Sequence, residues 1–295
     1  MKVLVFGARG QVGQVLRATC PYAEAVFLDR ATADLRDLRA VERTIAQTRP
    51  QLVINAAAYT SVDGAESEPD AAYAVNEAAP AAMATACAAL DARLLHLSTD
   101  YVFDGATRRP YRPGDLARPI NTYGASKLAG ERRIRATAGL RYLVIRSSWI
   151  YSQFARNSFF ALLERARPGE PLRIVDDQVG SPTSAWSLAD AIWRAARLPD
   201  CAGLVHFNDG GSVTRHEFFV AIFATAAACG LPVGEVVIEP ISTAEFQAGH
   251  PSAAARPAYS VLDSSEFRRQ IGLGTPDWKA ALRAAMERYV ETRHG

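Results

Sequence analysis

The sequence has few cysteines and few histidines, and neither residue is clustered. Its four cysteines lie far apart along the 295 residues, so no Cys-x-x-Cys pair predicts a metal or redox site. We expect four reduced, mostly buried thiols. The five histidines form no His-Glu-x-x-His spacing, and no Gly-x-Ser-x-Gly sequence occurs. These absences argue against zinc-protease and serine-hydrolase chemistry, and we predict no metal site.

The sequence also lacks a long apolar run and a marked net charge. No run approaches the roughly 18 apolar residues of a membrane-spanning helix. The first run, residues 3–6, ends at Gly7, too early for a signal peptide. We therefore expect a cytoplasmic protein with no membrane partner. Lys and Arg number 33 against 31 Asp and Glu, so the formal charge of +2 gives no reason to expect nucleic acid as a partner.

Short apolar runs alternate with segments of helical length over the first 150 residues. The runs are residues 3–6, 26–28, 52–54, 94–97 and 142–145. Helices are predicted between them, for example at 38–48 and 71–90. Nearly continuous apolar strands separated by helices indicate a parallel sheet that is covered on both faces. This is the doubly wound, Rossmann-type α/β plan.

The second half of the chain is less regular. The pattern predicts helices at 159–167, 184–197, 214–229 and 277–289, and strands at 204–207 and 236–238. Thr214 and Glu217 have the spacing of a capping box at the start of a helix. We expect a dinucleotide-binding domain of residues 1–150, rejoined by about 184–212. A smaller α/β substrate-binding domain would comprise residues 151–183 and 213–295.

A glycine-rich turn directly follows the first predicted strand. Its pattern is Gly-x-x-Gly-x-x-Gly, and a predicted helix follows it. Such glycines let the chain turn tightly, so that backbone amides at the helix N-terminus can bind a pyrophosphate. In this strand–turn–helix context the turn predicts a dinucleotide site. Its predicted contact residues are Gly7, Gly10, Gln11, Val12 and Gly13.

The choice between NADH and NADPH rests on two adjacent residues with opposite implications. Asp29 lies 19 residues after Gly10 (29 − 10), where an acid commonly binds the ribose 2′-hydroxyl of NAD. Arg30 could instead pair with the 2′-phosphate of NADP. Asp29 could also point away or cap the strand end. We favour NADPH and expect NADH to be accepted as well. Further predicted cofactor contacts are Asp34, Leu35, Ala56, Ala57 and Ala58.

Tyr123 and Lys127 form a Tyr-x-x-x-Lys motif in a segment that is predicted to be helical. A spacing of four places both side chains on one helix face. A neighbouring ammonium favours phenolate, so we expect Lys127 to lower the pKa of Tyr123 and make it an acid–base catalyst. Ser98 and Thr99 follow the strand of residues 94–97. A hydroxyl there is expected at the ligand-binding edge of the sheet, where it can bind the carbonyl oxygen that Tyr123 protonates.

These motifs, in this order, resemble the extended short-chain dehydrogenase/reductase superfamily. More narrowly, the chain resembles the dTDP-4-dehydrorhamnose reductase family over almost its whole length. The most specific strings are Ser-Thr-Asp-Tyr-Val-Phe-Asp-Gly at 98–105 and Asp-Gln-Val-Gly-Ser-Pro-Thr at 177–183. Other matching segments are residues 7–13, 55–60, 62–63, 65–69, 123–131, 146–151 and 256–257.

The resemblance implies a role for each matching residue. Tyr123 would be the general acid, Lys127 would tune it and bind the cofactor, and Thr99 would hold the C4 carbonyl oxygen. The nicotinamide would deliver hydride to the C4 ketone of a nucleotide-linked deoxysugar and give dTDP-L-rhamnose. The implied deoxysugar contacts are Asp100, Tyr101 and Trp149. The implied diphosphate contacts are Asn157 and Arg256.

The sequence departs from the family's pattern at one point and leaves alternatives open. Some members hold magnesium at a dimer interface through glutamates, one of them early in the first helix. Residues 13–15 contain no acid here, so we predict no metal, and a homodimer stays open. A dehydratase commonly carries Glu where Tyr101 stands, which disfavours elimination. The remaining alternatives are an epimerase and a non-catalytic NADP-binding regulatory subunit.

Overall fold

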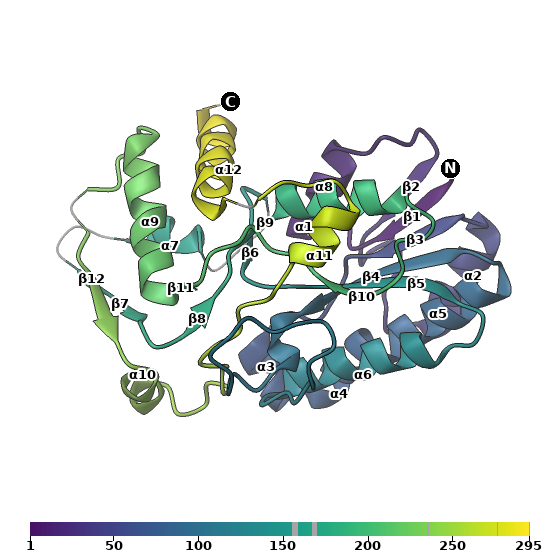
Figure 1. Cartoon of the computed structure of the whole chain (residues 1–295), viewed down its shortest axis with the longest axis horizontal. Coiled ribbons are helices and arrows are strands. Elements are labelled where there is room, and N and C mark those ends of the chain that lie inside the picture. Colours follow the sequence, from purple (N-terminus) through teal and green to yellow (C-terminus); the bar gives the residue numbers. More distant parts are fainter. Residues whose placement is uncertain (155–158, 167–169, 235, 276, 295) are drawn as a thin grey trace.

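The computed structural model describes residues 1–154, 159–166, 170–234, 236–275 and 277–294. A six-stranded parallel sheet with the order β10-β5-β4-β3-β1-β2 lies at its centre (Figure 1). The strands are β1 (Val3–Phe6), β2 (Ala25–Leu28), β3 (Leu52–Asn55), β4 (Arg93–Thr99), β5 (Arg141–Ser147) and β10 (Gly203–His206). All five apolar runs predicted as strands are confirmed, and so is the doubly wound α/β fold.

Helices cover both faces of the sheet because alternate strand residues are apolar on each side. In β1, Val3 and Val5 join one buried cluster, while Leu4 and Phe6 join the other. On the first face lie α1 (Gln11–Ala18), α8 (Ala185–Ala196) and α11 (Ser265–Gln270). The other face carries α2 (Leu38–Thr48), α3 (Val62–Ser67), α4 (Pro69–Tyr73), α5 (Ala79–Ala89) and α6 (Thr122–Ala136).

The helix predicted over residues 71–90 is not continuous. A π-helical turn, η1 (Ala74–Ala78), separates α4 from α5. Pro80 stands at the start of α5, where its missing N–H is tolerated. The buried Asn76 of η1 donates to Ser126 of α6 (Nδ2 to Oγ, 3.0 Å) and binds the Tyr59 backbone. The irregular turn therefore ties α6 to the loop that follows β3.

A third buried cluster belongs to elements of the second half of the chain, at the end of the molecule where α9 and α12 lie in Figure 1. Three pairs of short strands accompany it: β6 (Ile150–Tyr151) with β9 (Thr183–Ser184), β7 (Leu172–Val175) with β12 (Ile238–Ile241), and β8 (Val179–Gly180) with β11 (Val213–Thr214). The helices are α7 (Ala161–Arg165), α9 (Arg215–Ala228), α10 (Thr243–Gly249) and α12 (Trp278–His294). The capping box of Thr214 and Glu217 is confirmed.

Several boundaries in this half differ from the prediction, and the helix predicted at 277–289 extends to His294. The strand predicted at 236–238 is found at Ile238–Ile241, because its register is set by parallel pairing with β7. The helix predicted at 159–167 is shorter, Ala161–Arg165, and residue 167 lies outside the described residues. Within the described part of the chain, no helix is long and apolar enough to cross a membrane. All four cysteines are free, two of them buried and two half-buried.

Candidate active site

The glycine-rich turn lies where the strand order of the sheet reverses. β1 is flanked by β2 and β3, so the loops after β1 and β3 border the crevice in which doubly wound sheets bind ligands. Gly7 has a φ of 93°, and a Cβ there would lie 2.7 Å from the Ala56 carbonyl carbon. A Cβ on Gly13 would lie 2.0 Å from the Gly7 oxygen. The glycines are therefore required for the close approach of β1, α1 and the loop after β3.

The N-terminus of α1 is open to an anion. Gly10 is its N-cap and makes no side-chain capping bond, and the first turn contains no acid. Unpaired amides and the positive end of the helix dipole suit a pyrophosphate. The Gln11 side chain extends across to the second half of the chain. It donates to the Ile150 carbonyl at 3.4 Å and accepts from the Ser152 hydroxyl at 3.2 Å.

The two residues expected to select the cofactor have protein partners. The Asp29 carboxylate lies 2.7 Å from the Arg9 guanidinium and accepts hydrogen bonds from the backbone of Ala31 and Thr32. Hydrogen bonds from Thr32 and the charge of Arg9 hold the pKa of Asp29 below its usual value. Arg30 is 76 % exposed, with Nε 3.8 Å from the Asp34 carboxylate. Arg9 was not singled out from sequence, although its place inside the turn was a usable signal.

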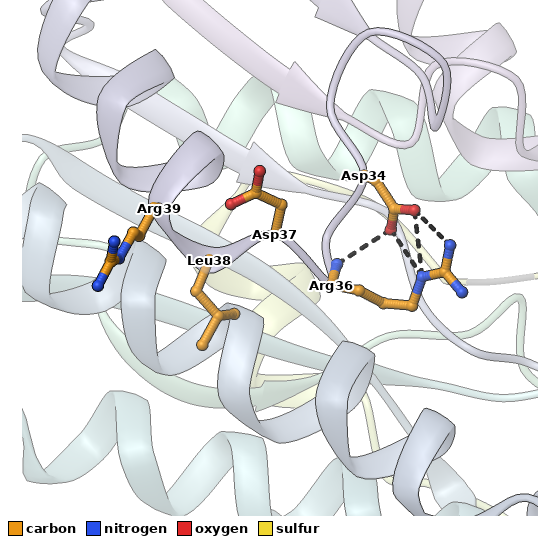
Figure 2. Close-up of a pocket in the computed structure, with 5 residues that line it drawn as sticks. All are labelled: Asp34, Arg36, Asp37, Leu38 and Arg39. Atoms are coloured by element: carbon orange, nitrogen blue, oxygen red, sulfur yellow. Dashed lines mark hydrogen bonds and ion pairs between the residues drawn. The ribbon is translucent and has the colours of Figure 1, made fainter.

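Asp34 borders a surface depression of about 730 Å³ at the start of α2. Figure 2 shows the Arg36 guanidinium folded against the Asp34 carboxylate, with an Nη2–Oδ2 distance of 2.6 Å, while Arg39 points to the other side. Arg36 lowers the pKa of Asp34 to about 2. Leu35 is buried in the hydrophobic cluster of the α2 face rather than exposed in this depression. Neither the predicted catalytic residues nor Asp100 line it.

The predicted catalytic residues converge from two elements. Thr99 ends β4, and Tyr123 lies in the first turn of α6, whose N-cap Asn121 accepts from the Gly124 amide at 2.7 Å. The Thr99 hydroxyl is near enough to Tyr123 to affect its ionisation. Tyr101 packs edge-on against Tyr123, with ring centroids 5.9 Å apart. The structure therefore brings together the phenol and the hydroxyl that the sequence paired.

The expected effect of Lys127 on Tyr123 is wrong for this arrangement. Burial raises the pKa of Tyr123 above its usual value, and the contact with Thr99 opposes that shift. Lys127 does not lower the pKa of Tyr123, because its Nζ points toward β4. There it donates to the Leu97 carbonyl at 2.7 Å and lies 3.2 Å from His96 Nε2. Burial lowers the pKa of Lys127 to about 8, opposed by the carboxylate of Glu131.

A buried polar network of Glu131, Arg146 and Ser98 joins α6 to β5 and β4, and the sequence did not predict it. Glu131 stands in an arginine-rich stretch of α6, yet it is 0 % exposed and accepts hydrogen bonds from the Arg146 guanidinium at 2.9 and 2.6 Å. Ser98 donates to the same carboxylate at 2.5 Å. Glu131 lies four residues after Lys127 and eight after Tyr123. This helical spacing was the available signal that Glu131 shares the buried face of α6 with them.

Two of the three predicted deoxysugar contacts, Asp100 and Tyr101, lie close to Tyr123. Asp100 is 2 % exposed, its Oδ2 has no partner among the described residues, and burial raises its pKa to about 6. Trp149 has a φ of 45°, an uncommon conformation for a bulky residue that often marks functional sites. Its ring lies against Gly180, where a Cβ would be 2.5 Å away. That contact accounts for the glycine in the Asp-Gln-Val-Gly-Ser-Pro-Thr string.

The two predicted diphosphate contacts have different outcomes. Arg256 Nη2 is held by the Asp63 carboxylate at 2.9 and 3.0 Å, and its Nη1 donates to the Ala254 carbonyl. Asn157 lies outside the described residues. The sequence did not single out Arg215, whose guanidinium lies over the rings of Trp149 and Phe159.

Comparison with known proteins gives matches over almost the whole chain. The family profile described as "RmlD substrate binding domain" matches residues 1–291. The dTDP-4-dehydrorhamnose reductase of Shigella flexneri is 34 % identical over 301 residues, with 99 % of each chain covered. The chain belongs to the dTDP-4-dehydrorhamnose reductase family.

Further relatives support membership of the family. The enzyme of the same name from Burkholderia thailandensis is 37 % identical over 293 residues, covering 96 % of this chain and 97 % of the relative. The crystal structure of dTDP-4-dehydrorhamnose reductase from Bacillus anthracis in complex with NADP superposes with a TM-score of 0.88. That chain is 32 % identical, and the match covers 99 % of this chain and 100 % of that one.

Proposed function

We propose that this protein reduces the C4 keto group of dTDP-4-dehydro-L-rhamnose to dTDP-L-rhamnose at the expense of NADPH. The observation that carries the proposal is the placement of Thr99 and Tyr123 together at the carboxyl edge of β4, beside a glycine-rich turn at the strand-order reversal. Membership of the dTDP-4-dehydrorhamnose reductase family supports the choice of substrate.

The cofactor's pyrophosphate would bind at the N-terminus of α1, because the N-cap Gly10 has no side chain and the first turn contains no acid. The bound nicotinamide would supply the hydride. Lys127 lies four residues after Tyr123 on α6, and it would bind the ribose hydroxyls of the nicotinamide half and fix its position. Ala56, Ala57 and Ala58 follow β3 and would border the nicotinamide.

Tyr123 would donate the proton that the reduction requires. Its burial keeps the phenol protonated at neutral pH, so the proton is available when negative charge develops on the substrate oxygen. The Thr99 hydroxyl would donate a hydrogen bond to the same oxygen and hold the carbonyl in place. Positioned donors of this kind act on the charge of the transition state without reorganising.

Asp100, Tyr101 and Trp149 would form the deoxysugar side of the site. The unpartnered Oδ2 of Asp100 is an acceptor for a sugar hydroxyl, and its burial makes that hydrogen bond strong. We also propose that residues 151–183 and 213–295 act as the substrate-binding part, since most of the third buried cluster lies there. The cytoplasmic location and the homodimer stay predictions.

The test is a stoichiometric assay with dTDP-4-dehydro-L-rhamnose and NADPH. We expect one NADP⁺ released for each dTDP-L-rhamnose formed. An epimerase would return the hydride and release no stoichiometric NADP⁺. A regulatory subunit would bind NADPH without turnover, and either result would contradict the proposal.

A further inference from the structure

We infer that Arg215 is a substrate-binding residue whose guanidinium holds a phosphate oxygen of the nucleoside diphosphate. The inference rests on the proposed function, because it assigns a part of that substrate to a residue that no sequence motif identified. It is carried by four features of Arg215: a fixed backbone, a guanidinium stacked on aromatic rings, proximity to Asp100 and Tyr101, and the absence of a carboxylate partner among the described residues.

The backbone of Arg215 is fixed at the first position of α9. The N-cap Thr214 and Glu217 exchange hydrogen bonds in a capping box, and the strand before it pairs with β8. The Arg215 amide donates to the Gln178 carbonyl at 2.9 Å. The side chain therefore leaves a rigid point, beside the N-terminal end of a 14-residue helix, whose dipole also favours an anion.

The guanidinium lies over two aromatic rings, those of Trp149 and Phe159, on the deoxysugar side of the site. Its central carbon lies 5.7 Å from the Trp149 ring centroid and 5.5 Å from that of Phe159. Burial raises the pKa of Asp100 and of Tyr101, and the nearby charge of Arg215 opposes both shifts. Stacking fixes the plane of an arginine and leaves its edge nitrogens free to donate.

Arg215 is the better placed of the two candidate cations. Among the described residues, no carboxylate lies within ion-pair distance of Arg215, whereas Arg256 is already bound by Asp63. A diphosphate bound there would bring two negative charges beside aromatic rings, where unpaired charge is costly. A planar guanidinium binds two phosphate oxygens at once, which suits this position.

The experiment compares the affinities of dTDP and of thymidine by calorimetry, in the presence of NADP⁺, for the parent protein and Arg215→Gln. The matched control is Arg288→Gln, because Arg288 stacks on Trp186 at 4.0 Å. Loss of a charge-assisted hydrogen bond weakens binding by about 10- to 100-fold. We expect that loss for dTDP with Arg215→Gln, with thymidine and NADPH affinities unchanged and the control variant normal. Arg215→Lys should restore part of the dTDP affinity.

Two results would overturn the inference. Equal dTDP affinity of the parent and Arg215→Gln would exclude a phosphate contact. If Arg215→Gln weakened the binding of dTDP and of thymidine equally, Arg215 would instead serve to pack the rings of Trp149 and Phe159. Neither result depends on turnover, so failure of the proposed reduction would be seen separately in the NADPH assay.

Discussion

At the residue scale, the site combines two buried titratable groups that do not face each other. Tyr123 is kept neutral by burial, and Lys127 is turned toward β4 with a pKa of about 8. The Tyr-x-x-x-Lys spacing predicted the shared helix face but could not predict the direction of the ammonium. That direction depends on Leu97 and His96, which the fold brings from another element.

Replacing Tyr123 with Phe removes the proposed proton donor and little else. We expect kcat to fall by about 10²- to 10⁴-fold, the usual contribution of a positioned general acid. The affinity for NADPH should stay unchanged, because the phenol is not needed for pyrophosphate binding. Tyr59→Phe is the control, since that phenol bonds to the exposed Glu68. Full activity of Tyr123→Phe would remove the assignment.

Asp100 makes the reaction pH-dependent in a defined direction. Burial raises its pKa to about 6, so the carboxylate is charged above pH 6 and becomes protonated as the pH falls through that value. The charged form is the acceptor for a substrate hydroxyl. We therefore expect kcat/KM to fall about tenfold per pH unit below pH 6. The Asp100→Asn variant should have low activity and should not show this fall of kcat/KM below pH 6. If the variant shows the same fall, another group is responsible for it.

At the element scale, α6 is the central support of the site. It carries Tyr123, Lys127 and Glu131 at intervals of four residues, and the last of these is anchored to Arg146 of β5. The helix was predictable because its motif and periodicity are local. Burial of Glu131 was not, because the partner that makes burial tolerable lies 15 residues away on a strand.

Glu131→Gln should destabilise the fold strongly. Arg146 is 2 % exposed and would keep its charge with no carboxylate partner, a change that costs about 3–5 kcal/mol. Glu77→Gln is the matched control, because it breaks the Glu77–Arg133 pair near the surface, where such pairs contribute about 1 kcal/mol or less. Urea unfolding measures both free energies. Similar losses for the two variants would mean that the buried pair has no special role.

Other elements show where local pattern was insufficient. The sheet strands were predictable because each is a short, nearly continuous apolar run. The β12 strand was displaced by its pairing with β7, and the π-helical turn η1 interrupted a segment that reads as one helix. In both cases contacts with a distant element outweigh the local sequence preference.

At the scale of the whole molecule, the order of the strands places the glycine-rich turn, Thr99 and Tyr123 on one edge of the sheet. The sequence predicted these because each belongs to a motif with a fixed position relative to a strand. It did not predict the pairing of Asp29 with Arg9 or of Asp63 with Arg256. Those pairs form only when segments separated in the sequence meet, and they change which charges remain available to ligands.

The cofactor preference follows from this distribution of charge. Asp29 is already paired with Arg9. Arg30 is largely exposed and lies 3.8 Å from Asp34, a carboxylate that Arg36 binds more closely at 2.6 Å, so we expect Arg30 to exchange this weak contact for a 2′-phosphate. Arg30→Ala should lower kcat/KM for NADPH about tenfold, the loss of one exposed charge-assisted contact, and leave the value for NADH unchanged. Arg283→Ala on α12 is the control. Equal losses for both cofactors would show that Arg30 does not contact the 2′-phosphate.

The most direct test of the proposed function follows the hydride itself. NADPH carrying deuterium at the transferred C4 position is supplied with dTDP-4-dehydro-L-rhamnose, and the product is analysed by mass spectrometry and NMR. We predict dTDP-L-rhamnose with one deuterium at C4 of the sugar and an equal amount of free NADP⁺. A product without deuterium, or no product at all, would contradict the assignment of this protein as a reductase.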